Sequence, residues 1–89
     1  MKTIIVVGED NHGTICYAAN VYSAIKFLIK NSWINENTVI DELGTTVKEY
    51  YECFGIDWKT NLANLSLERF NELFCDRFLL TEEKIEYFF

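Results

Sequence analysis

The 89-residue sequence contains no proline, four glycines and a single histidine. Its three cysteines, Cys16, Cys53 and Cys75, are far apart and form no C-x-x-C pair. One histidine and three scattered cysteines match no known spacing of metal ligands, so we expect neither a metal site nor a cofactor. An odd number of isolated cysteines with apolar or aromatic neighbours predicts reduced, mostly buried thiols, as in a cytosolic protein.

Long apolar runs are also missing from the N-terminal region. The run TIIVV, residues 3–7, is followed directly by the polar residues GED. Five residues are too few for a signal peptide and far too few to cross a bilayer. We therefore expect an intracellular protein, located in the cytoplasm.

Basic residues are fewer than acidic ones, at 8 against 14, which gives a net charge of −6. Residues 1–40 are neutral overall, so the whole excess lies in residues 41–89, where eleven acids face five bases. Such a surface repels phosphate backbones and anionic lipid headgroups. We therefore expect no direct binding of nucleic acid or membrane, and a basic protein as the partner.

The composition is that of a folded chain, because 49% of the residues are hydrophobic, 16% are aromatic and only 25% are charged. No repeat, linker or low-complexity segment is visible. The length suits one small core, so we expect a single domain over residues 1–89 with marginal stability.

The first half predicts a hairpin followed by a helix. The stretch KTIIVVG, residues 2–8, is β-branched on both faces, which is typical of a central strand covered on both sides. It is expected to pair with TICYAA, residues 14–19. From Asn20 apolar residues recur at helical spacing up to Trp33, with Lys26 and Lys30 on the other side. The stretch TVI, residues 38–40, is a candidate for a short edge strand.

The second half predicts three short helical segments. Thr46 and Glu49 form a capping box for a helix that ends at Gly55. Asp57 and Ser66 are the expected caps of a short turn and of a further helix. Residues 77–89 predict two short strands around TEEK, with a helix from residue 81 as the alternative. The fold class is thus α+β, a small antiparallel sheet packed against three or four short helices.

The only histidine lies in the polar turn between the first two strands. Catalysis there would require a nucleophile or carboxylate aimed at His12, and sequence proximity on a hairpin does not provide one. Asp10, Asn11 and Gly13 are residues that turns favour, so we interpret the segment as turn chemistry. An alternative is a ligand site, in which the backbone N–H groups of residues 10–13 bind an anion.

The acidic residues near the end of the chain have helical spacing. Glu68, Glu72 and Asp76 are four residues apart and are predicted to line one helix face, about 6 Å apart along the axis. This step is close to the spacing of phosphates along a nucleic-acid strand. The face is either a solvated helix surface or a partner-binding surface for a basic groove, which Glu49 and Glu52 would extend.

Three stretches carry a resemblance to a class of proteins: NHG at 11–13, AIKFLIKNSW at 24–33 and LSLERFNELF at 65–74. In these stretches the chain resembles small proteins carried by bacteriophages and mobile elements of AT-rich Gram-positive bacteria. Small acidic phage proteins often inhibit host defence, some by imitating nucleic acid in front of a nuclease. The resemblance brings no catalytic residues with it, and it implies an inhibitory, non-enzymatic role.

The sequence therefore predicts an acidic, non-enzymatic binding protein, of the kind that inhibits a host defence system such as CRISPR by occupying a basic groove of a nucleic-acid-binding effector. Two alternatives belong to other classes. The first is a small-ligand binding protein that takes up a nucleotide signal at residues 10–13. The second is a phage accessory or regulatory protein that acts as a homodimer.

Overall fold

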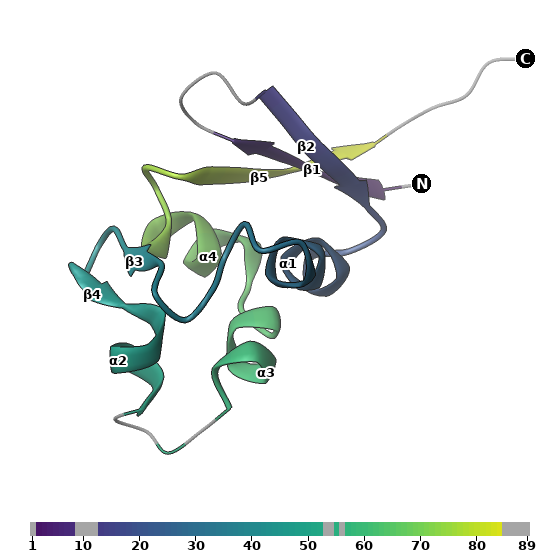
Figure 1. The fold of residues 1–89 in the computed structure, drawn as a ribbon. Helices are drawn as coiled ribbons and strands as arrows, with labels where there is room; N and C mark the ends of the chain where they lie inside the picture. Colours follow the sequence, from purple (N-terminus) through teal and green to yellow (C-terminus); the bar gives the residue numbers. More distant parts are fainter. Residues whose placement is uncertain (1, 9–12, 53–54, 56, 85–89) are drawn as a thin grey trace, which may run out of the picture.

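The computed structural model describes residues 2–8, 13–52, 55 and 57–84. These residues form a three-stranded sheet, a separate two-stranded hairpin and four helices, an α+β fold as expected (Figure 1). In chain order the elements are β1 (Lys2–Gly8), β2 (Gly13–Ala18), α1 (Val21–Lys30), β3 (Val39–Ile40), β4 (Thr45–Thr46), α2 (Val47–Glu52), α3 (Trp58–Ala63), α4 (Leu67–Leu73) and β5 (Phe78–Lys84).

Strand β1 is the central strand of the main sheet, whose order is β2-β1-β5. Both neighbours are antiparallel to it, and Val6 lies opposite Cys16 on one side and Leu80 on the other. The register to β2 shifts between Val6 and Val7, which marks a β-bulge. The central position predicted for residues 2–8 and the hairpin with the following strand are confirmed.

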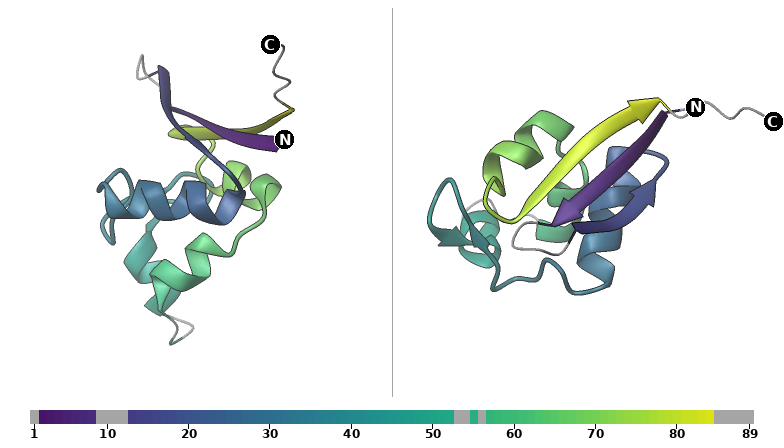
Figure 2. Two further views of the ribbon diagram at one scale, coloured as in Figure 1. Left: turned by 90° about the vertical axis from the view of Figure 1, so that its right-hand side faces the viewer. Right: turned by 90° about the horizontal axis from the view of Figure 1, so that it is seen from above.

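The helices all lie on one face of this sheet (Figures 1 and 2). Ile4 and Val6 point to the helices and are buried, whereas Ile5 and Val7 alternate to the outer face and are half-buried. On that outer face Tyr17 of β2 is 66% exposed. The prediction that β1 is covered on both sides was therefore wrong for the part of the chain that the structure describes, in which no helix lies on the outer face of the sheet.

The core lies between the sheet and the helices. Helix α1 contributes Ala24, Ile25 and Leu28, which are fully buried at the spacing of an amphipathic helix. From the C-terminal half, Phe70 and Phe74 stack with ring centroids 4.9 Å apart. Helix α1 thus covers the N-terminal hairpin as predicted, although it ends before Trp33, which is 37% exposed.

Helices α2, α3 and α4 begin at the capping residues that the sequence predicted. Thr46 Oγ1 accepts the N–H of Glu49 at 3.2 Å. Asp57 and Ser66 are the N-caps of α3 and α4. Gly55 has a positive φ of 62° and donates its N–H to the carbonyl of Glu52. Helix α2 ends at Glu52, and residues 53–54 of the predicted helix lie outside the described residues.

The C-terminal region differs from both expectations for it. Residues 78–84 form one strand, so TEEK neither separates two strands nor begins a helix. The reason is non-local: β5 pairs with the open edge of β1 over its whole length, from Gly8 opposite Phe78 to Lys2 opposite Lys84. Pairing with β1 provides hydrogen-bond partners for the backbone of residues 81–84 in a strand, and this outweighs their local tendency to form a helix. Residues 85–89 lie outside the described residues.

The predicted edge strand at 38–40 also pairs in an unexpected way. Val39 and Ile40 form β3, which pairs with β4 and not with the main sheet. Gly44, with a positive φ of 71°, lies in the short connection. Strand β4 was missed because a two-residue strand shows no alternation that a sequence pattern could reveal.

One asparagine side chain joins α4 to the free edge of β5. Asn71 Nδ2 donates to the carbonyl of Leu80 and its Oδ1 accepts the N–H of Leu80, both at 2.9 Å. In an antiparallel strand the N–H and C=O of one residue point to the same side, here away from β1. The amide of Asn71 therefore takes the place that another strand would otherwise occupy.

The first prediction concerns this side-chain bridge. Asn71→Ala leaves two partly buried backbone groups without a partner, which we expect to lower the free energy of unfolding by about 1–3 kcal/mol. Urea denaturation followed by circular dichroism measures the change. Asn37→Ala in an exposed loop is the matched control and is expected to change stability by less than about 0.5 kcal/mol. Equal stability of the two variants would contradict the assigned role.

A second prediction concerns Gly13 at the start of β2, whose φ is +64°. No atom lies within 4 Å of a Cβ built at this position, so a side chain there costs conformational strain and not a clash. We expect Gly13→Val to destabilise the fold by about 1–3 kcal/mol and Gly13→Asn by clearly less, because asparagine tolerates positive φ. Thermal unfolding compares the two variants; similar melting temperatures for Val and Asn would refute a backbone origin.

Candidate functional site

The three acids predicted to share one helix face are found on two different segments. Glu68 and Glu72 are exposed on α4, but Asp76 lies beyond Leu73, the last residue of this helix. The chain turns there so that Phe78 can enter the sheet opposite Gly8. A continuous row of three carboxylates on one helix was therefore an incorrect prediction.

Two arginines organise the acids around them. Arg69 Nη1 lies 2.8 Å from Glu72 and 3.1 Å from Glu42, which is 27 residues earlier in the chain. The hydrogen bond that Arg69 donates to Glu72 is the main reason that the pKa of Arg69 is raised, with a smaller effect of Glu42 in the same direction. Arg69 thus links α4 to the hairpin of β3 and β4.

The second arginine makes a similar link. Arg77 Nε lies 3.3 Å from Asp41 Oδ1 and donates to the carbonyl of Val39 at 3.2 Å. The other oxygen of Asp41 accepts the backbone N–H of Asp76 at 3.2 Å. We call the resulting region the acidic surface; it consists of Asp41, Glu42, Glu68, Glu72 and Asp76 together with Arg69 and Arg77. Five carboxylates against two guanidinium groups leave it with an excess of three negative charges.

Two apolar side chains border the acidic surface. Val39 and Leu43, which precede and follow the acids of the β3–β4 hairpin, are 36% and 42% exposed. Exposed aliphatic groups beside charged ones are a common composition of protein-binding surfaces, where the apolar groups lose water and the charges form the rim.

Helix α2 adjoins the acidic surface through Tyr50. Arg69 donates a hydrogen bond to the hydroxyl of Tyr50, which adds to the raised pKa of this arginine. The predicted partner-binding residues Glu49 and Glu52 are both exposed on the same helix.

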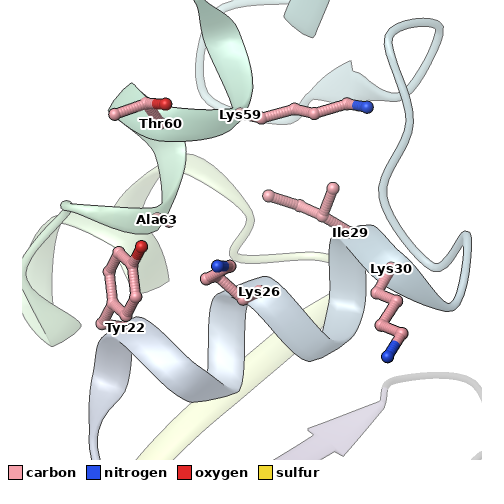
Figure 3. A pocket seen from close by; sticks show the side chains of 7 residues that line it. All are labelled: Tyr22, Lys26, Ile29, Lys30, Lys59, Thr60 and Ala63. Atoms are coloured by element: carbon pink, nitrogen blue, oxygen red, sulfur yellow. The ribbon is translucent and has the colours of Figure 1, made fainter.

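A second region, which we did not predict, lies between α1 and α3 (Figure 3). It is a hollow of about 410 Å³. We call it the lysine hollow; its lining residues are Tyr22, Lys26, Ile29 and Lys30 of α1 and Lys59, Thr60 and Ala63 of α3. The sequence placed Lys26 and Lys30 on the outer side of α1, but gave no sign that Lys59 lines the same hollow, because it lies about thirty residues further along the chain.

Most of the turn that contains the histidine lies outside the described residues. This applies to Asp10, Asn11 and His12, so the alternative ligand site there stays a prediction. Gly13 is described, and its positive φ agrees with the role in the turn that we expected for it.

The cysteines agree only in part with the expected buried thiols. Cys16 and Cys75 are free, but Cys16 is half-buried and Cys75 is exposed beside the acidic surface. The prediction of a shielded thiol was wrong for Cys75, because α4 ends just before it and the chain passes along the surface. Cys53 lies outside the described residues.

The described part of the chain contains no group of three or more residues suited to hold a metal ion. Within the same residues, none of the helices has the length and apolar character needed to cross a membrane.

A labelling experiment tests the position of Cys75. Its thiol pKa is raised, first by partial desolvation and then by the nearby Asp76 and Asp41. Because the thiolate is the reactive form, we expect the labelling rate of native protein to keep rising as the pH increases past 9. The fastest phase of thiol labelling by a maleimide should disappear in the variant Cys75→Ser and persist in Cys16→Ser. A fast phase that survives in Cys75→Ser would place the accessible thiol elsewhere.

Comparisons with known proteins do not add to this description: no family model matches the chain, and neither does any curated protein or solved structure.

Proposed function

We propose that this chain is a non-enzymatic binding protein whose acidic surface contacts a basic region of a partner protein. The observation that carries the proposal is the arrangement around Arg69 and Arg77. Carboxylates from the β3–β4 hairpin and from α4 are held there by arginines of α4 and of the segment after it, although up to 38 residues separate the groups that these arginines connect.

The paired arginines support binding rather than simple solvation. The two ion pairs of Arg69 are exposed and add little to stability, about 0–1 kcal/mol each. They do fix the positions of the carboxylates of Glu42 and Glu72, which would otherwise be free to rotate. Carboxylates held in place lose less side-chain entropy when a basic partner binds.

The partner that fits this surface is a protein with a basic groove. Its lysines and arginines would face an excess of three negative charges, while Val39 and Leu43 would supply apolar contact area. Proteins that bind nucleic acid have such grooves. We therefore propose the role of an anti-defence inhibitor, similar to an anti-CRISPR protein, that blocks a nucleic-acid-binding effector of the host cell.

Charge reversal tests this function. We expect Glu68→Lys/Glu72→Lys to lose a basic protein that the unaltered chain retains from a host lysate at low salt. The control Glu36→Lys/Glu83→Lys removes two exposed acids outside the acidic surface and changes the net charge by the same amount, from −6 to −2. The control is expected to retain the partner.

Two further measurements specify the mode of binding. The association rate should fall as salt rises, because steering by exposed charges is screened beyond about 8 Å at physiological ionic strength. Nucleic acid added to the complex should release the partner if the acids occupy its nucleic-acid groove. Retention of the partner by all three proteins with equal affinity at low salt would refute the proposed function.

A further inference from the structure

The basic side chains of this acidic protein are not evenly distributed. Both arginines are engaged in ion pairs on the acidic surface. Three of the chain's eight basic residues, Lys26, Lys30 and Lys59, line the lysine hollow. Of the described residues that line it none is acidic, and none of the three lysines has an ion pair with a described residue.

The positions of the lysines are unfavourable for the free protein. Lys26 and Lys30 are four residues apart on α1, where two like charges destabilise a helix by about 0.2–0.5 kcal/mol. Lys59 brings a third positive charge to the same hollow from α3. Among the described residues, aromatic rings offset two of these charges: Lys26 Nζ lies 5.2 Å from the ring centre of Tyr22, and Lys59 Nζ lies 5.8 Å from that of Trp58. Lys30 lies in the last turn of α1, where the helix dipole favours a positive charge. A bound anion would relieve the repulsion.

The geometry of the hollow distinguishes the roles of the lysines. In Figure 3 Lys59 extends from α3 above Ile29, and Lys26 rises from α1 beside Tyr22, whereas Lys30 is directed away from α3. Lys26 and Lys59 therefore flank the hollow from two elements. Lys30 adds positive potential at its rim without facing the opposite helix.

The remaining lining residues suit an organic ligand. Ile29 and Ala63 provide an apolar floor, and Tyr22 carries a hydroxyl group that can donate to an anion. The hydroxyl of Thr60 already donates to Asp57 Oδ2 at 2.9 Å, so Thr60 contributes only its methyl group to the lining. The volume of about 410 Å³ falls within the range of about 300–1,000 Å³ that is typical of small-molecule sites. A second hollow of about 430 Å³ adjoins it, sharing Ile29 and Lys59 and exposing the ring of Trp58.

We propose that the lysine hollow binds a phosphorylated small molecule of about nucleotide size. Its phosphate groups lie between Lys26 and Lys59, and its apolar part rests on Ile29 and Ala63. This site lies on α1 and α3 and shares no residue with the acidic surface, so it is independent of the function proposed above.

Binding is tested with adenosine diphosphate and pyrophosphate, with adenosine as the probe that lacks phosphate. Isothermal titration measures affinity, and Trp58 fluorescence in a Trp33→Phe background reports on the hollow itself, because Trp58 lines the adjoining space. We expect the two phosphorylated probes to bind and to weaken as salt rises, while adenosine binds more weakly than adenosine diphosphate.

Single substitutions locate the site. Lys26→Ala and Lys59→Ala are each expected to weaken binding at least about tenfold, since each removes a charge-assisted hydrogen bond. Lys48→Ala, at an exposed lysine of α2 outside the hollow, changes the charge equally and should leave the affinity unchanged.

Three outcomes would overturn the proposal. One is the absence of binding of both phosphorylated probes at millimolar concentration to a protein whose melting temperature shows it to be folded. Another is equal weakening in all three lysine variants. The third is that a single-stranded oligonucleotide binds more tightly than adenosine diphosphate and that this binding depends on Lys26 and Lys59. The hollow would then be part of a nucleic-acid-binding surface.

Discussion

The pairing of β5 with β1 is the constraint on which the rest of the structure depends. It joins strands that are about seventy residues apart in the chain and makes the N-terminal strand the centre of the sheet. Every helix lies in the chain between these two strands and on the same side of the sheet; α1 and α4 pack against the sheet, and α3 packs against α1 (Figure 2). Without β5, Val6 would lose its neighbour Leu80, and the aromatic cluster of Phe70, Phe74 and Phe78 would lose one member.

Both candidate surfaces follow from this closure. Asn71 fastens α4 to β5, and on the exposed side of the same helix Arg69 pairs with both Glu72 and Glu42. On the other side of the fold α1 covers the hairpin, and α3 packs against α1 to enclose the lysine hollow. The two surfaces therefore depend on different helix contacts.

The net charge of −6 does not reveal that acidic and basic side chains gather on two different surfaces. Arginines with planar, forked side chains join the carboxylates, which suits them to hold several acids in fixed positions. The lysines instead project flexible side chains with compact charges into a hollow without an acid among its described lining residues. The described part of the chain thus presents regions of opposite charge, and the average composition describes neither of them.

The sequence by itself determined the elements whose cause is local. The caps at Thr46, Asp57 and Ser66, the positive φ of Gly13 and the α+β class follow from hydrogen bonds and periodicities within a few residues, so they could be predicted. Tertiary structure decided the rest. Pairing with β1 made residues 78–84 one strand, the turn after α4 removed Asp76 from the predicted helix face, and packing of α3 on α1 brought Lys59 to Lys26. Each of these three features depends on contacts between residues that are far apart in the chain. A local sequence pattern does not show which distant residues come together or how much free energy their contact contributes.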